Sequence, residues 1–200
     1  MGRRSDHSRE ELAAMILTEG QRLMADTGFA RFSAREVAKR IGYSVGTVTN
    51  VFGGIDGLVS AINARTFLLW AEAMEARLAG VARQERITTL VSGYFAFATE
   101  NSNLWSAIYE HRQPPGEPMP DALVVARTAL VTIITREVAG VLRRASLNLA
   151  AGLSHSLIAT VHGHCTFALN GSFGLLGEKD PLGLAIDRVR EVLRAHGAVV

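Results

Sequence analysis

The sequence predicts an all-α fold of about nine helices. Apolar residues recur at helical spacing along most of the chain, and no segment shows the alternating pattern of a half-buried strand. Residues typical of helix starts, Ser, Asp and Asn, precede these stripes, and Gly or Pro follows them. With 200 residues, 48% of them hydrophobic, the chain is long enough to bury a sizeable core.

The first three predicted helices are identified by their caps. Ser8 with Glu11, and Ser33 with Glu36, have the spacing of a capping box, in which each side chain satisfies a backbone donor of the other residue. Ser44 is a suitable N-cap for the third helix. In chain order, these helices are expected at Ser8–Gly28, Ser33–Gly42 and Ser44–Phe52.

The next three helices follow a double glycine. Asp56 is the expected N-cap of a long helix that reaches about Leu78. Residues 87–98 carry the clearest amphipathic stripe of the chain, and Asn103 is expected to cap a short helix after it. Four prolines between residues 114 and 120 then predict a loop.

Three helices are expected in the last 80 residues. One begins at Asp121 and ends near residue 144, where two arginines suit the helix dipole. The next is an uncharged helix from Leu147 to about Ser172. The last has Asp180 as its N-cap, proline at its first position and a stop at Gly197.

The composition excludes one class of protein and indicates a compartment. Cys165 is the only cysteine, and a lone thiol forms no intramolecular bridge, so a disulfide-stapled secreted scaffold is excluded. The N-terminal segment is basic but lacks the apolar run of a signal peptide. We therefore expect a protein of the reducing cytoplasm.

One long segment without charge invites comparison with a membrane span. Residues 145–177 contain no Asp, Glu, Lys or Arg over 33 positions. Three histidines and five glycines interrupt them, whereas a spanning helix needs about 20 predominantly apolar residues. We expect no membrane partner here, and instead a helix buried inside a domain or at a subunit interface.

Charge is distributed unevenly. Residues 1–50 carry eight basic and six acidic side chains, while residues 51–200 carry thirteen of each, so the whole net charge of +2 lies in the first quarter. An excess of this size is a weak indication of a negatively charged partner in that quarter.

Residues 33–52 have the pattern of a helix-turn-helix, the motif that places its second helix in a DNA groove. Ala38 is small where the two helices would cross, and Gly42 lies where the turn requires a left-handed residue. The second helix has a polar outer face, and the amides at its start form an anion site suited to phosphate. Positive charge around the motif comes from Arg35, Lys39 and Arg40, and an N-terminal arm with Arg3 and Arg4 is expected to add to it.

The run FSAREVAKRIGYSVGTVTNVFGGIDGLV, preceded by HSREELAAMILTEGQRLMADTG, resembles the N-terminal domain of the TetR family of bacterial transcription regulators. This resemblance implies a DNA-binding domain at residues 1–55 and a ligand-binding and dimerisation domain at residues 56–200. It implies a double-stranded DNA operator and a homodimer. Because the first of them lacks charge, the last two helices, from Leu147 to about Ser172 and from Pro181 to His196, are the expected dimer interface. The candidate DNA-binding residues are Ser33, Arg35, Ser44, Val45, Gly46, Thr47, Thr49 and Asn50.

The resemblance also implies a small hydrophobic effector bound among the C-terminal helices. Aromatic and apolar residues with a few polar groups suit such a pocket, although the same residues are equally typical of a core. The candidate ligand-binding residues are Trp70, Tyr94, Trp105, Tyr109, Ile134 and His162. His162 with Gly163 is also similar to the subgroup named for a Trp-His-Gly motif, with Val161 in place of Trp.

Two departures from the family pattern motivate an alternative function. The family usually has Tyr late in the recognition helix and Lys just after it, where this chain has Thr49 and Ile55. The alternative is a helical ligand-binding or scaffold protein whose DNA binding is weakened or lost.

Other chemistry has less support. His155, His162, His164 and Cys165 are metal-ligand types, but no second cluster accompanies them, and no metal or other cofactor is predicted. None of the nucleophile-elbow, phosphate-loop or dinucleotide patterns occurs, so we predict no catalytic residue and no enzyme.

Overall fold

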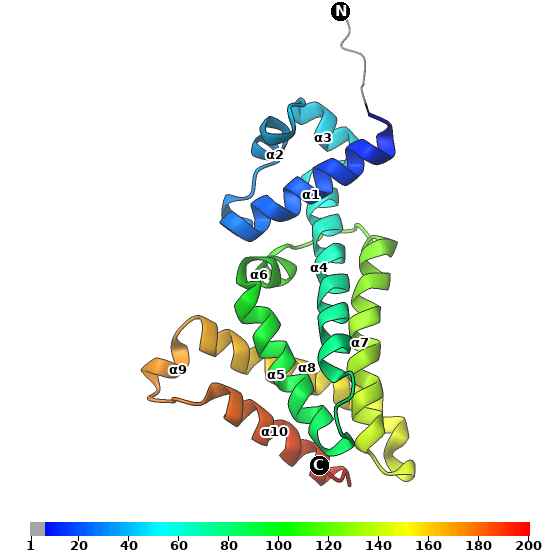
Figure 1. The fold of residues 1–200 in the computed structure, drawn as a ribbon, viewed down its shortest axis with the longest axis vertical. Coiled ribbons are helices and arrows are strands. Elements are labelled where there is room, and N and C mark those ends of the chain that lie inside the picture. Colours follow the sequence, from blue (N-terminus) through cyan, green and yellow to red (C-terminus); the bar gives the residue numbers. More distant parts are fainter. Residues whose placement is uncertain (1–6) are drawn as a thin grey trace, which may run out of the picture. The chain divides into compact units, whose positions relative to one another are not determined.

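The computed structural model describes residues 7–200 (Figure 1). Ten α-helices and three short 3-10 helices follow one another, and these residues contain no strand. The all-α prediction is confirmed, and the additional helix is the single turn α9 at the end of the uncharged segment. The α-helices are α1 (Arg9–Thr27), α2 (Ala34–Ile41), α3 (Val45–Phe52), α4 (Ile55–Leu78), α5 (Arg86–Glu100), α6 (Ser102–Glu110), α7 (Asp121–Val141), α8 (Ala150–Leu169), α9 (Ser172–Leu175) and α10 (Pro181–Ala195). The 3-10 helices are η1 (Phe29–Arg31), η2 (Arg83–Glu85) and η3 (Arg144–Leu149).

The two capping boxes predicted near the N-terminus differ in outcome. At α1 the Ser8 hydroxyl accepts a hydrogen bond from the Glu11 amide, and the Glu11 carboxylate accepts one from the Ser8 amide at 2.7 Å, as predicted. Ser33 precedes α2 but makes no side-chain cap bond, so the second capping box is wrong. The Glu36 carboxylate instead accepts a hydrogen bond from Arg40, one turn further along α2, at 3.2 Å.

Two other helices start earlier than predicted. α4 begins one residue before Asp56, which therefore lies in the first turn and is not the N-cap. α6 begins one residue before Asn103, whose amide donates a hydrogen bond to the Ala25 carbonyl of α1 at 2.7 Å. Asp180 caps α10 as predicted, because its carboxylate accepts a hydrogen bond from the Gly183 amide at 2.9 Å.

The chain packs into two compact units. The N-unit consists of the described part of residues 1–67 together with residues 101–127, and the C-unit consists of residues 68–100 and 128–200. The helices α4 and α7 each contribute residues to both units. The functional boundary expected between residues 55 and 56 stays a prediction.

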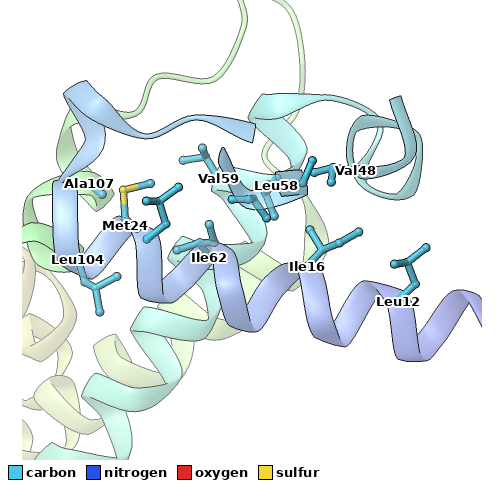
Figure 2. Packing of buried hydrophobic residues seen from close by; sticks show 12 residues of the cluster. Leu12, Ile16, Met24, Val48, Leu58, Val59, Ile62, Leu104 and Ala107 are labelled. Carbon is cyan, nitrogen blue, oxygen red and sulfur yellow. The ribbon is translucent and has the colours of Figure 1, made fainter. Parts of the chain in front are cut away.

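The N-unit is built around one apolar core (Figure 2). Residues of α1, α2, α3, α4 and α6 meet in it, among them Ile16, Val48 and Leu58, which are all completely buried. Burial of each such side chain contributes roughly 1.5–3 kcal/mol to folding. α6 belongs to this core through Leu104 and Ala107, although it lies far from α1–α3 in the sequence.

In the C-unit, α10 packs against α5 and α8. The largest fully buried side chain of the C-unit is that of Trp70, on α4, which is 1% exposed. The Trp70 ring stacks on Phe97 with centroids 4.7 Å apart and meets Tyr94 edge to face at 4.8 Å. These contacts make Trp70 the centre of an aromatic cluster.

A second feature of the C-unit is a polar cluster around the buried carboxylate of Glu137. The Arg86 guanidinium donates to Glu137 from two nitrogens, with Nη2 lying 2.9 Å from Oε1. Arg136 donates to Glu137 at 2.8 Å and forms a two-bond pair with Glu75 at 2.7 and 3.0 Å. The Arg86 guanidinium holds the pKa of Glu137 below its ordinary value despite its burial.

Taken singly, each helix described in residues 7–200 is too short or too polar to cross a membrane. The pair α3 and α4, which meet at a bend of 64°, reaches the required length and apolar composition when the two are joined.

Candidate DNA-binding surface and ligand cavities

α2 and α3 form a helix-turn-helix whose turn is built by local residue chemistry. α2 ends at Gly42, which has φ of 75° and so lies in the left-handed region that glycine tolerates best. Val37 and Val48 are completely buried, and Ala38 is 2% exposed. These residues of the two helices lie in one buried core.

The start of α3 is capped by Ser44. Its hydroxyl accepts a hydrogen bond from the Thr47 amide at 3.1 Å and lies 2.8 Å from the Thr47 hydroxyl. Val45 and Gly46 form the exposed first turn, where backbone amides have no partner within the helix. This end of α3 can therefore receive a phosphate oxygen.

The remaining polar residues of α3 differ in how free their side chains are. Asn50 is exposed and has no hydrogen-bond partner among the described residues. The Thr49 hydroxyl is directed to its own helix, where it reaches the Val45 and Gly46 carbonyls, both at 3.2 Å. Asn50 therefore offers a better group for a base edge than Thr49 does.

The positive charge of α2 is only partly available. Arg35 and Lys39 are exposed and have no ion-pair partner within residues 7–200. Arg40 pairs with Glu19 at 3.0 Å and Glu36 at 3.2 Å, and the hydrogen bond to Glu19 is the main cause of its raised pKa. The positive charge of Arg40 is therefore offset by two carboxylates. Ser33, also predicted to bind DNA, lies half-buried just before α2.

The structure adds two residues that the sequence interpretation missed. A groove of about 460 Å³ runs between the start of α1 and α3, and both His7 and Arg9 line it together with the predicted residues Ser44, Thr47 and Asn50. The His7 ring nitrogen Nδ1 lies 2.7 Å from the hydroxyl of Tyr43 in the turn. The sequence feature that could have indicated this role is Arg9, a basic residue directly after the Ser8 cap. The predicted arm residues Arg3 and Arg4 lie outside the described residues.

The C-unit contains an almost wholly apolar cavity. The predicted ligand-binding residues Tyr94 and Ile134 line it. The Tyr94 hydroxyl lies 3.0 Å from Nδ1 of His162, whose pKa is lowered by burial, so the neutral imidazole is favoured. The cavity volume is about 30 Å³, little more than one water molecule requires.

The other three predicted ligand residues lie elsewhere. Trp70 belongs to the aromatic cluster of the C-unit and does not line the cavity. Trp105 and Tyr109 belong to the N-unit, where their rings meet edge to face with centroids 5.3 Å apart. The six predicted residues are therefore divided between the two units.

A second cavity, larger and more polar, lies within the N-unit. Its volume is about 200 Å³, and we call it the polar cavity. Among the ligand-binding predictions only Tyr109 lines it. Its walls come from α4, α6, the loop after α6 and α7, through Asn63, Phe67, Ile108, Tyr109, His111, Gln113, Met119, Leu123 and Arg127.

The histidine-rich part of α8 does not assemble metal ligands. His164 is hydrogen-bonded to the Thr160 carbonyl at 2.8 Å, and burial raises the pKa of Cys165 to about 11. No three His, Cys, Asp or Glu side chains come together as a metal site in residues 7–200.

Solved structures share the fold of this chain at low sequence identity. A protein of unknown function from Rhodococcus sp. RHA1 has a TM-score of 0.73 and 21% identity, with 100% of both chains covered. A tetR-family transcriptional regulator from Streptomyces coelicolor has a TM-score of 0.65 and 21% identity, covering 98% of this chain and 82% of that one. RolR in complex with resorcinol has a TM-score of 0.68 and 16% identity, covering 95% and 89%. No curated protein matches the sequence.

Two family models match the sequence itself. The model described as bacterial regulatory proteins, tetR family, matches residues 16–62, which include the helix-turn-helix. The model described as tetracyclin repressor-like, C-terminal domain, matches residues 87–190, which is more than half of the chain. The resemblance inferred from the helix-turn-helix residues is thereby confirmed. The chain belongs to the TetR family of bacterial transcriptional regulators, which are not enzymes.

Proposed function

We propose that this regulator is a repressor that binds a palindromic operator as a homodimer and is released by a small effector. The observation that carries the proposal is the outer face of α3. There Asn50 is unpaired among the described residues, and Ser44 and Thr47 line the same groove as Arg9. Such a face can read base edges while the exposed first turn of α3 holds a phosphate.

Dimerisation through α8 and α10 is part of the proposal. Phe167 and Leu169 of α8 are 46% and 40% exposed, and Leu184 of α10 is 41% exposed. Large apolar side chains left on two neighbouring helices support an interface between identical copies. A dimer must present its two recognition helices about 34 to 36 Å apart to occupy successive major grooves. A ligand that favours another arrangement therefore releases the operator.

The effector is proposed to be a small hydrophobic molecule that binds in the part of the chain from residue 56 onward. Resorcinol, which RolR holds in its complex, is a molecule of this kind, and RolR shares the fold. The similarity of His162 and Gly163 to the Trp-His-Gly subgroup stays a prediction. We also propose that the protein is cytoplasmic, because a transcriptional regulator must reach its DNA operator.

One observation favours a second candidate, a ligand-binding protein with weakened DNA binding. The Thr49 hydroxyl is bonded to its own helix, and Ile55, 40% exposed, offers a phosphate no charge. Without the two phosphate contacts expected from the family pattern, the salt dependence of binding should fall by somewhat under two units of slope per half-site.

The experiment that decides between these candidates is selection of random double-stranded DNA by the purified protein. Enrichment of a palindrome supports the repressor, whereas a folded dimer that enriches nothing supports the second candidate. For the enriched site, we expect the double variant Thr47→Ala with Asn50→Ala to lose most of its sequence preference. Each base contact contributes roughly 1–3 kcal/mol of discrimination. The variant Thr132→Ala, at an exposed position of α7, is the control, and operator binding unchanged in the double variant contradicts the assignment.

Arg35 is expected to contact phosphate and not a base, because it is exposed on α2 next to the recognition helix. Arg35→Gln should weaken binding to all sequences alike and lower the salt slope by about 0.9 for each half-site. Arg144→Gln, an exposed arginine in η3 of the C-unit, should leave the slope unchanged. The measurement is operator affinity at several salt concentrations. A slope equal to that of the unmodified protein contradicts the phosphate contact.

A further inference from the structure

The polar cavity contains a buried acceptor without a donor. Asn63 is 2% exposed, and its amide nitrogen donates to the Ala107 carbonyl at 3.4 Å. That bond fixes the orientation of the amide, because the reverse orientation would place two oxygens against each other. The carbonyl oxygen Oδ1 of Asn63 then has no hydrogen-bond partner among the described residues. An unsatisfied buried acceptor beside an open cavity indicates that something with a donor binds there.

The same cavity contains an unpaired cation. Arg127 lines it and forms no hydrogen bond or ion pair within the described part of the chain. The other polar side chains are already engaged, since His111 bonds to Asp56 at 3.1 Å and Gln113 donates to Ser60 at 2.8 Å. The cavity therefore presents an acceptor, Asn63 Oδ1, and a guanidinium, that of Arg127, which have no partner among the described residues.

Size and apolar lining restrict the occupant further. A volume of about 200 Å³ corresponds to roughly seven water molecules at about 30 Å³ each, which is the space of one ring with its substituents. Phe67 of α4 and Tyr109 of α6 supply aromatic walls. Aromatic side chains favour a flat ring between or against them. The apolar cavity of the C-unit, at about 30 Å³, is too small for such a molecule.

The cavity is also joined to the helix-turn-helix inside one compact unit. Asn63 is bonded to Ala107, which belongs to the core that α1, α2 and α3 share. His111 bonds to Asp56 in the first turn of α4, four residues after α3 ends at Phe52. The His111 ring also meets Phe29 edge to face at 5.9 Å. Movement of α6 or of its following loop therefore changes contacts that hold the DNA-binding helices.

From these observations we propose that the polar cavity is the effector site, and that the effector is not wholly hydrophobic but a single aromatic ring that carries one hydroxyl and one carboxylate. The hydroxyl donates to Oδ1 of Asn63, the carboxylate pairs with Arg127, and the ring packs against Phe67 and Tyr109. This inference rests on the proposed function for its regulatory consequence. It concerns ligand chemistry that can be measured without DNA.

The test uses calorimetric titration of the full-length protein with three probes. Para-hydroxybenzoate carries both groups, benzoate lacks the hydroxyl, and phenol lacks the carboxylate. We expect para-hydroxybenzoate to bind at least roughly ten-fold more tightly than benzoate or phenol. Each of these two probes lacks one group and therefore cannot form the hydrogen bond or ion pair that this group makes with a buried or charged partner. Equal affinity for all three, or no heat from any of them, overturns the proposal.

Two variants locate the binding. Arg127→Gln should abolish the preference for para-hydroxybenzoate over phenol, and Asn63→Leu should abolish the preference over benzoate. Arg112→Gln, at another exposed arginine of the N-unit with no partner among the described residues, should change neither preference. Arg127 is exposed and unpaired, so its variant is expected to fold even if Asn63→Leu does not. Tight binding that survives Arg127→Gln places the ligand elsewhere and overturns the proposal.

Operator binding separates this inference from the proposed function. Bound para-hydroxybenzoate should weaken operator affinity at least several-fold. If an operator is found but no probe binds, the cavity assignment fails while the repressor stands. If the probes bind as expected but no DNA is enriched, the repressor fails while the ligand site stands.

Discussion

We expect Gly57→Ala to destabilise the N-unit and to abolish operator binding. Gly57 lies in the first turn of α4, where an added Cβ would fall far inside van der Waals contact with the backbone carbonyl oxygen of Phe52, at the end of α3. The two helices are joined only by Gly53 and Gly54, whose φ values of 72° and 131° suit glycine alone. The contacting atom belongs to the backbone, so no side-chain rotation and no flexible loop can relieve the overlap. The recognition helix must therefore shift relative to α4.

The expected cost of Gly57→Ala is about 2–3 kcal/mol of unfolding free energy, at the upper end for overpacking, because the obstructing atom is backbone. This exceeds the gain of about 1 kcal/mol that alanine ordinarily brings to a helix interior. Denaturant unfolding and operator affinity are the measurements.

Gly140→Ala is the matched control for Gly57→Ala. It is also a glycine within a helix, α7, but a Cβ there meets nothing within 4 Å. Gly140→Ala should be neutral or slightly stabilising. If both variants behave alike, the close approach of Phe52 to Gly57 is not what fixes α3.

The DNA-binding half of the fold was predictable because its determinants are local in sequence. The Ser8 and Glu11 pair, the left-handed Gly42 and the Ser44 cap each act within a few residues of their own position. Capping fails as a predictor where a competing partner lies on the same helix, and Glu36 illustrates this by pairing with Arg40 instead of capping.

The candidate ligand sites were less predictable because helical periodicity identifies a buried face but not the core that it joins. Trp105 and Tyr109 lie on a buried face of α6, yet α6 joins the N-unit, and Tyr94 and Ile134 line a cavity of the C-unit. The role of Asn63 depends on a contact with Ala107, 44 residues away, which no local pattern contains. The ion pair of Arg40 was not predicted for the same reason, since its partner Glu19 lies on another helix.

We expect Glu137→Gln to cost about 2–3 kcal/mol of unfolding free energy. Glu137 is 5% exposed and satisfies both Arg86 and Arg136, so its loss leaves two guanidinium groups facing a neutral amide. Removing one member of a buried ion pair ordinarily costs roughly 3–5 kcal/mol. The lower figure applies here because glutamine still accepts one hydrogen bond and the arginines keep partial contact with water. Denaturant unfolding at neutral pH measures the cost.

Glu75→Gln is the matched control for Glu137→Gln, because Glu75 belongs to the same cluster but is about half exposed. Loss of the Glu75 carboxylate should lower the free energy of unfolding by less than about 1 kcal/mol, as is usual for exposed ion pairs. If the two variants cost the same, burial of Glu137 is not what makes the cluster stabilising.

The same carboxylate predicts how stability depends on pH. The Arg86 guanidinium keeps the pKa of Glu137 below the ordinary glutamate value of 4.5 in the folded chain. The unfolded chain therefore binds protons more readily, so the contribution of Glu137 is fully present above pH 4.5 and is lost as the pH falls through the lowered folded value. Glu137→Gln has no proton to take up at this position. Its unfolding free energy should fall less steeply with acidification than that of the unmodified protein, and parallel curves would show that the cluster does not couple protonation to folding.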